Sequence, residues 1–329
     1  MIAPLVLLGL LAGAYTRAGA PALDALDRLV SPGDPVVHLA FAGDLAMALD
    51  VGKTVEAQAA GGAAVEVGYP FASVTERVAA ADLAIGNLEC VVSPLGVPKP
   101  SAPVTFRAPE LVLGVIQRAG FDMVSVANNH VLDYGPDALD DMIARLDRVK
   151  LPHVGNARRS AGPEAPLIRE VHGLKIGFFG FFDADMDKAC RDVAGARAGV
   201  DLVVVFNHWG HEGQASPLGA QQSFGRMLVD AGADLVVGTH AHVLQPEEWY
   251  RGRLIFYGLG NFVFAGMGFD ERHRVGGFLE VDMTRRGVVA RRLYRTRLDD
   301  TGAPRWLDEG AVEPERVPER GARVKLHSP

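Results

Sequence analysis

The residues best suited to chemistry are polar side chains that follow apolar, strand-like segments. The segment DLVVGTHAHVLQP (residues 234–246) begins as a buried strand and ends with His240 and His242, two residues apart. Imidazole is a common metal ligand, and two imidazoles at one strand end seldom arise from packing needs. This segment therefore favours metal binding.

Five other strand-like segments also end in polar residues. Their types are carboxylate, amide and imidazole, and such O and N ligands suit Mn, Fe or Zn better than a thiolate-seeking metal. Taken alone, each has a structural alternative, namely a helix cap, a turn or a buried core histidine. Six strand ends with one chemistry are harder to explain as turns, so together they favour a metal site. The residues are Asp44; Asn87 and Glu89; Asn128, Asn129 and His130; Asn207 and His208; and Asn261.

The elements that must bring these residues together are short apolar strands alternating with amphipathic helices. Prolines near the first turn and glycines after the last mark several of the helices. This alternation predicts an α/β fold with helices covering a sheet, and the carboxyl ends of neighbouring strands in such a sheet line one crevice. Strands are expected at 36–43, 82–87, 122–129, 174–182, 201–208, 234–240 and 254–262, and helices at 71–81, 109–120, 136–149 and 219–232. A hairpin is expected after residue 275, with its turn near residues 285–287.

Composition limits the kind of protein. The chain has 329 residues, 48% of them hydrophobic and 22% charged, which is enough to bury a full core. Its net charge of −7 and the lack of Lys/Arg-rich runs argue against a nucleic-acid partner. Two cysteines, Cys90 and Cys190, leave open one disulfide or two separate thiols.

The two ends of the chain differ from the part between them. Residues 2–14 are apolar and AGA follows at 18–20, so residues 1–20 are predicted to be a signal peptide or an N-terminal anchor. This predicts an exported protein that is periplasmic or associated with the cell envelope. Residues 299–329 are rich in Pro, Arg and Glu without periodicity, which predicts a loosely ordered tail.

Six motifs in order carry a family resemblance. They are FAGDLAM, NLE, VANNHVLDYG, NHWGHE, GTHAHVLQPEE and YGLGNFVF, and they span residues 36–264. Together they resemble the CapA family, which is associated with poly-γ-glutamate capsule synthesis and in turn resembles the calcineurin-like metallophosphoesterases. The resemblance implies that residues 34–298 form one domain, a four-layer α/β/β/α sandwich with a dinuclear metal site at the strand ends.

The resemblance also implies roles for individual residues. Asp44 and His242 would bind the first ion, Glu89 would bridge both ions, and Asn129, His208 and His240 would complete the second. His130 would be the acid or charge stabiliser, while Arg107 and Asn261 would bind an anionic small-molecule or polymer substrate. For Arg107, a surface salt bridge is an equal alternative. The chain departs from the pattern of the calcineurin-like superfamily at Ala46, where a histidine is usual, and at Glu89, where aspartate is usual. It departs from the CapA pattern at Gly213, where an aromatic residue is common.

Three functions remain open at this point. Two ions can lower the pKa of a shared water, so the first is hydrolysis of a phosphoester by metal-bound hydroxide. The second is an accessory role in polyglutamate synthesis or export within an envelope biosynthesis complex. The third is hydrolysis or transfer at γ-glutamyl amide bonds. The residues named bind metal rather than the leaving group, and they do not choose between these substrates.

Overall fold

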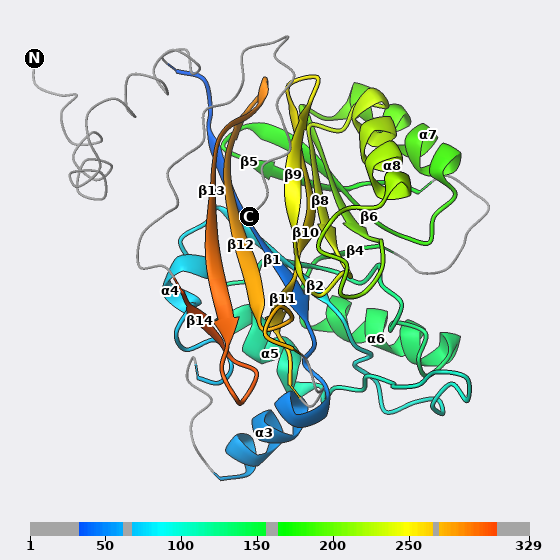
Figure 1. Cartoon of the computed structure of the whole chain (residues 1–329), viewed down its shortest axis with the longest axis vertical. Coiled ribbons are helices and arrows are strands. Elements are labelled where there is room, and N and C mark those ends of the chain that lie inside the picture. The colour runs from blue at the N-terminus through cyan, green and yellow to red at the C-terminus, as the bar shows by residue number, and fades with distance from the viewer. Residues whose placement is uncertain (1–32, 62–67, 156–163, 266–269, 308–329) are drawn as a thin grey trace, which may run out of the picture.

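The centre of the protein is a pair of stacked β-sheets with helices on both outer faces (Figure 1). The computed structural model describes residues 33–61, 68–155, 164–265 and 270–307. The predicted signal peptide or anchor, residues 1–20, lies outside this range. The predicted α/β class and the four-layer α/β/β/α sandwich are confirmed.

The first sheet has eight strands in the order β14–β13–β12–β1–β2–β3–β4, with β11 also paired to β1. The strands β1, β2, β3 and β4 run parallel, whereas β12 is antiparallel to both β1 and β13. The bounds are β1 Val37–Leu45, β2 Leu83–Leu88, β3 Met123–Ser125, β4 His153–Val154, β11 Asn261–Val263, β12 Val275–Thr284, β13 Gly287–Leu298 and β14 Pro304–Trp306.

The second sheet has six strands in the order β5–β6–β7–β8–β10–β9, of which β6, β7, β8 and β10 are parallel. Their bounds are β5 Leu167–Val171, β6 Leu174–Phe182, β7 Leu202–His208, β8 Leu235–Thr239, β9 Leu244–Tyr250 and β10 Arg253–Leu259. The helices are α3 Leu49–Ala60, α4 Thr75–Val78, α5 Leu111–Arg118, α6 Pro136–Arg148, α7 Met186–Ala196 and α8 Gly219–Asp230, with a short 3₁₀ turn at Arg197–Gly199.

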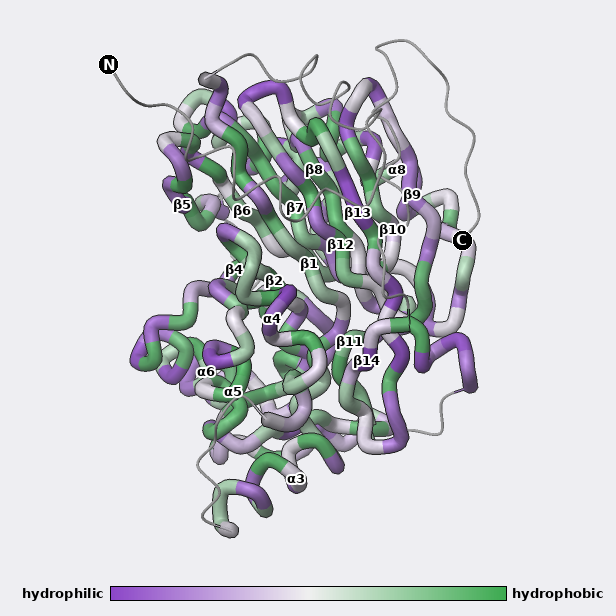
Figure 2. Tube along the Cα trace, turned by 90° about the vertical axis from the view of Figure 1, so that its left-hand side faces the viewer, coloured by the Kyte–Doolittle hydropathy of each residue, from purple (hydrophilic) through white to green (hydrophobic). Residues whose placement is uncertain are grey.

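Three apolar layers hold the four structural layers together. Along β1, Leu39 and Phe41 point into the core between the sheets, while Ala40 and Ala42 face the core shared with α3, α5 and α6. A third core lies between the second sheet and the helices α7 and α8. Figure 2 shows the matching run of hydrophobic residues along the strands of both sheets. Because each central strand is buried on both faces, its sequence is apolar without alternation.

The predicted helices are found with three adjustments. Helices α5, α6 and α8 lie within the predicted ranges 109–120, 136–149 and 219–232. The range 71–81 is wrong in extent, because residues 69–74 form turns and only α4 is helical. The sequence did not predict α3 or α7. No side chain caps the start of α3, which also carries Gly52, so the usual start signal is missing.

The predicted C-terminal tail begins too early. Residues 304–306 form β14 beside β13, and the ring of Trp306 lies 5.7 Å from that of Phe278 and 6.0 Å from that of Tyr294. This aromatic packing extends the folded domain beyond residue 298. Residues 308–329 lie outside the described range. The cysteines do not pair: Cys90 is buried in the core beneath α3 and α5, and Cys190 lies on α7.

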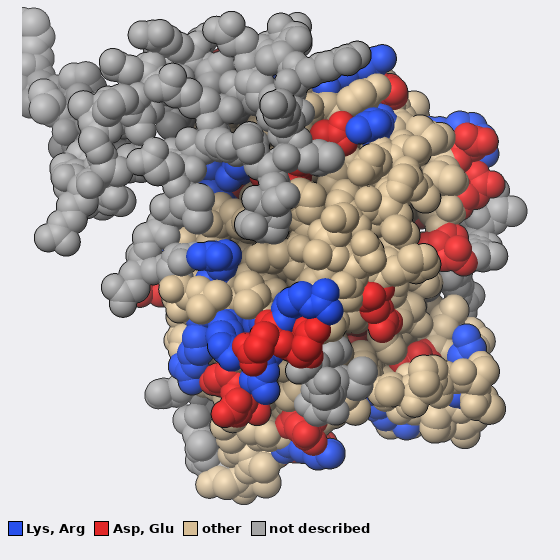
Figure 3. Space-filling view, in the orientation of Figure 1, with Lys and Arg blue, Asp and Glu red and all other residues tan. Residues whose placement is uncertain are grey.

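Surface features add little that is specific. In the part of the chain that the structure describes, none of the helices combines the length and apolar character needed to cross a bilayer. Figure 3 shows basic and acidic side chains side by side on the face seen in Figure 1. Exposed ion pairs such as Arg274–Asp300, at 3.1 Å, are typical of this surface and contribute little to stability.

Candidate metal centre

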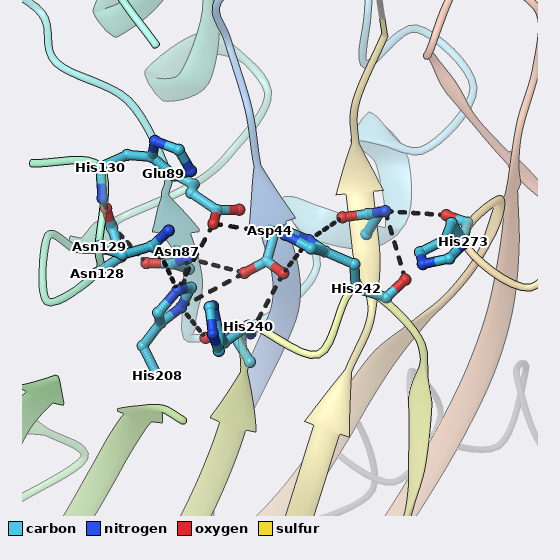
Figure 4. Close-up of polar contacts among 12 residues, drawn as sticks. Asp44, Asn87, Glu89, Asn128, Asn129, His130, His208, His240, His242 and His273 are labelled. Carbon is cyan, nitrogen blue, oxygen red and sulfur yellow. Dashed lines mark hydrogen bonds and ion pairs between the residues drawn. The ribbon is translucent and has the colours of Figure 1, made fainter. Parts of the chain in front are cut away.

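The predicted strand-end residues meet at one edge of the two sheets (Figure 4). In the first sheet, the parallel pairing of β1 and β2 places Asp44 beside Asn87, and β11 places Asn261 on the other side of Asp44. In the second sheet, the pairing of β7 and β8 places His208 beside Thr239. The two sheets touch here, because Nδ2 of Asn87 lies 3.2 Å from Nδ1 of His208.

Two groups of side chains have ligand atoms close enough to hold one ion each. Asp44, Glu89 and His242 form the first group. Glu89, His208 and His240 form the second, and within each group the ligand atoms lie within 4.8 Å of one another. Glu89 belongs to both, with its Oε1 3.6 Å from Nε2 of His208 and 3.9 Å from Nε2 of His242. The geometry therefore suits two cations that share one carboxylate.

The polar atoms of both groups fit divalent cations. Within the described residues, both carboxyl oxygens of Glu89 and Nδ1 of His240 are buried without a hydrogen-bond partner. A buried polar atom left unsatisfied costs about 1–3 kcal/mol, so such atoms call for a ligand. Asn129 adds an amide oxygen, 2.7 Å from Nε2 of His208. Carboxylate, amide and imidazole donors suit divalent Mn, Fe or Zn.

The pKa values in the cluster respond to burial and to neighbouring charge. Burial and the adjacent Asp44 raise the pKa of Glu89 well above its usual value. Burial alone would lower the pKa of His242, but the carboxylates of Glu89 and Asp44 outweigh it and raise it to about 10. Burial and the neighbouring His240 hold the pKa of His208 well below its usual value. At neutral pH, therefore, His208 is a neutral imidazole, whereas His242 holds a proton that a cation must displace.

Binding of divalent ions is accordingly expected to release a proton from His242. Because the protonated forms compete with the metal, affinity should rise as the pH is raised through the neutral range. Titration calorimetry with Mn or Zn, in two buffers of different ionisation enthalpy at the same pH, measures the release directly. An apparent binding enthalpy that is equal in the two buffers would contradict the assignment of this proton to His242.

A network of amides supports the ligand side chains, and sequence reasoning did not assign roles to its members. Asn87 donates a hydrogen bond to Oδ1 of Asp44 (2.8 Å) and accepts one from Nδ2 of Asn128 (3.0 Å). Nδ1 of His208 lies 2.9 Å from Oγ1 of Thr239. Partners of this kind fix the orientation of metal-binding side chains. Asn87 and Asn128 stand at strand ends in the sequence, but only their distances show that they support other residues.

The chain around the paired histidines adopts an uncommon conformation. His240 and His242 have φ angles of 88° and 56°, in the left-handed region that residues other than glycine rarely adopt. Such strain is concentrated at functional sites. Gly213 has φ 72° and donates its backbone N–H to the carbonyl oxygen of Ala241 (2.8 Å). This conformation explains why glycine stands at a position where the family commonly has an aromatic residue.

His130 lies at the edge of the cluster, beside Asn129 and Glu89 (Figure 4). Its Nδ1 lies 2.7 Å from Oδ2 of Asp133, and its ring stacks on Phe106 with centroids 3.9 Å apart. Asp133 is buried and also accepts a hydrogen bond from the backbone N–H of Phe106 (2.7 Å). The spacing of three residues in NNHVLD is the signal from which Asp133 could have been found. The arrangement holds the imidazole with Nδ1 engaged and Nε2 available.

The two predicted substrate-binding residues already have protein partners. Arg107 donates to the backbone carbonyl oxygens of Leu95 (2.5 Å) and Gly96 (3.1 Å), and its guanidinium lies 3.6 Å from the ring centre of Tyr134. The arginine thus fastens the loop that follows the second motif. Asn261 is fully buried and its side-chain oxygen lies 2.9 Å from Nδ1 of His242. Substrate binding by either residue stays a prediction.

Relatives of known description share the chain's sequence over most of the described domain. It is 31% identical over 220 residues to the capsule biosynthesis protein CapA of Bacillus anthracis, covering 60% of this chain and 54% of the relative. It is 30% identical over 250 residues to the PGA biosynthesis protein CapA of Bacillus subtilis, covering 70% of this chain and 64% of the relative. A probable polyglutamine synthesis accessory protein of Mycobacterium tuberculosis is 29% identical over 272 residues, with 69% of this chain and 71% of the relative covered. The chain thus spans between about half and two thirds of the length of the two Bacillus relatives.

Among solved structures, the zinc complex of Vps29 from Entamoeba histolytica covers 69% of this chain and 96% of its own, at 14% identity and a TM-score of 0.28. A likeness of this size adds nothing to the fold described above. The profile of the family described as "Bacterial capsule synthesis protein PGA_cap" matches residues 38–266, which is well over half of the chain, and the protein belongs to this family.

Proposed function

We propose that this protein is a hydrolase that depends on two divalent ions and cleaves a phosphoester. The observation that carries the proposal is the shared carboxylate of Glu89, which belongs to two overlapping groups of ligand atoms and whose oxygens have no hydrogen-bond partner in the described structure. Asp44 and His242 would hold the first ion, and Asn129, His208 and His240 the second. When bound, such a pair of ions supplies a Lewis acid that activates water and offsets charge on a phosphoryl group.

The chain's own residues then have distinct tasks. The buried ligands, with exposures of 0% for Asp44 and Glu89, exclude bulk water from the floor of the site. His130, held by Asp133 and Phe106, presents Nε2 at the edge of the cluster, where it would protonate a leaving oxygen or stabilise charge on the phosphoryl group. A neutral His208 keeps a lone pair for coordination across the neutral pH range.

The biological setting comes from the relatives rather than from the site. Two relatives are named for capsule or PGA biosynthesis and a third as a synthesis accessory protein. We therefore propose that the activity serves poly-γ-glutamate capsule biosynthesis at the cell envelope, within a biosynthetic complex. The name of the third relative favours a competing function, an accessory role without turnover. Hydrolysis or transfer at γ-glutamyl amide bonds is the third candidate.

A parallel assay distinguishes the three functions. The metal-loaded protein is given p-nitrophenyl phosphate, bis-p-nitrophenyl phosphate and a γ-glutamyl oligomer, with His240→Ala as the control that removes a ligand. We expect cleavage of at least one phosphoester by the wild type and none above background by the variant. Cleavage of the γ-glutamyl oligomer alone would replace the phosphoesterase proposal by amide chemistry. No measurable cleavage of any of the three substrates, with both ions bound, would favour the accessory role.

A further inference from the structure

Asn261 is held more tightly than a substrate-binding residue requires. It begins β11, is fully buried and stands beside Asp44 in the pairing of β11 with β1. The preceding Gly260 has φ 66°, and its carbonyl oxygen would lie 1.9 Å from a Cβ placed on Gly43. Because both glycines are required for this close approach, the backbone fixes Asn261 at one position relative to the first group of ligands.

The amide of Asn261 is fully used by the protein. Nδ2 donates to the backbone carbonyl oxygen of His273 (2.9 Å) and lies 3.4 Å from that of His242, while Oδ1 lies 2.9 Å from Nδ1 of His242. Figure 4 shows His242 and His273 to the right of Asp44. Two carbonyl oxygens on one side require a donor there, so the amide nitrogen must face them and the amide oxygen must face the imidazole. Nδ1 of His242 is therefore the donor in this contact, and Oδ2 of Asp44, a member of the first group of ligands, lies 3.2 Å from the same nitrogen.

We propose that Asn261 is a positioning residue for the first metal site: it holds the Nδ1 proton of His242 and so leaves Nε2 as the nitrogen that binds the ion. This inference rests on the metal centre of the proposed function. An outer partner that engages one imidazole nitrogen sets which nitrogen coordinates and keeps the ring oriented. The contact of Nδ2 with the carbonyl oxygen of His242 also supports the left-handed backbone at that residue.

The first site depends on this support more than the second does. Ala46, two residues after Asp44, offers no ligand atom, and the first group has three protein ligands, Asp44, Glu89 and His242. The second group has Glu89 with two imidazoles, and the amide oxygen of Asn129 lies beside them. Disturbing His242 should therefore weaken the binding of one ion and leave the binding of the other unchanged. General destabilisation of the domain would weaken both.

The test measures metal binding rather than hydrolysis. Asn261→Leu removes both polar atoms at similar size, Asn261→Ala does so without added bulk if the leucine variant does not fold, and Asn261→Asp keeps an oxygen toward His242. Thr296→Val is the matched control, because this buried hydroxyl has no hydrogen-bond partner in the described structure and its residue pairs with Gly276, which packs against the backbone of Asn261. Each metal-free protein is checked for folding by circular dichroism and titrated with Mn and with Zn by calorimetry.

We expect the wild type and Thr296→Val to bind two ions. In Asn261→Leu or Asn261→Ala, one of the two steps should weaken by about 10–100-fold, the usual effect of losing an outer partner of a ligand. Asn261→Asp should restore that step at least in part. Both steps unchanged in the leucine and alanine variants would overturn the inference while leaving the metal centre intact. A wild type that binds no ion would overturn the metal centre itself, and the inference with it.

Discussion

Replacing Glu89 by glutamine is expected to remove stoichiometric binding of two ions and to lower phosphoester hydrolysis by roughly a thousandfold or more. Glu89 is the one residue that belongs to both groups of ligand atoms, so its charge is lost from both sites at once. The Lewis-acid contribution of such ions amounts to several kcal/mol, and each 1.36 kcal/mol corresponds to about a tenfold change in rate. Elemental analysis after Mn or Zn loading and gel filtration measures the ions, and initial rates measure the activity.

Glu212→Gln is the matched control for this variant. Glu212 is an exposed carboxylate whose charge reaches both Glu89 and His240, yet it belongs to neither group of ligand atoms. If the field of a nearby negative charge were sufficient to hold the ions, the two glutamine variants would behave alike. We expect Glu212→Gln to keep both ions. Two ions retained in Glu89→Gln would show that its carboxylate does not bridge them.

The fold was predictable where the sequence pattern reflects burial. Central strands such as β1, β7 and β8 are buried on both faces, so their apolar runs are unmistakable. The strands that escaped prediction lie at sheet edges: β5 (LIREV) and β9 (LQPEEWY) carry charged residues because one side has no neighbouring strand. Helix α3 has no proline in its first turn and carries Gly52, and tertiary packing of Val51 and Val55 holds it.

The candidate site was predictable to the extent that strand ends converge. Topology alone brings Asp44, Glu89 and the paired histidines to one edge, and the structure places their ligand atoms within reach of one another. Topology does not show which polar residue supports another, because that depends on the distances between individual side-chain atoms. The role of Asp133 was therefore not predicted, nor were the contacts of the Asn261 amide with His242 and His273, while substrate binding by Asn261 stays a prediction.

The second large effect is expected at His130. His130→Ala should lower kcat for phenyl phosphate by about 10²–10⁴-fold, the usual contribution of a positioned general acid. Both ions should remain bound, because His130 belongs to neither group of ligand atoms. His153→Ala is the control, since this partly buried histidine on β4 contacts only a backbone carbonyl oxygen among the described hydrogen bonds, at 3.4 Å. Loss of metal in proportion to activity would make His130 a ligand instead.

A comparison of two leaving groups distinguishes the two possible roles of His130, proton donor and charge stabiliser. Phenol has a pKa near that of tyrosine, about 10, and its oxygen needs a proton as it departs, whereas p-nitrophenolate leaves without one. If His130 is the acid, the loss in His130→Ala should be much larger for phenyl phosphate than for p-nitrophenyl phosphate. Equal losses on the two esters would assign the imidazole to charge stabilisation on the phosphoryl group.

Asp133→Asn should show the same dependence on the leaving group at smaller magnitude, because it weakens the hold on Nδ1 of His130 but leaves the ring stacked on Phe106. An equal fall in rate on the two esters in Asp133→Asn would mean that Asp133 supports the loop and not the proton transfer.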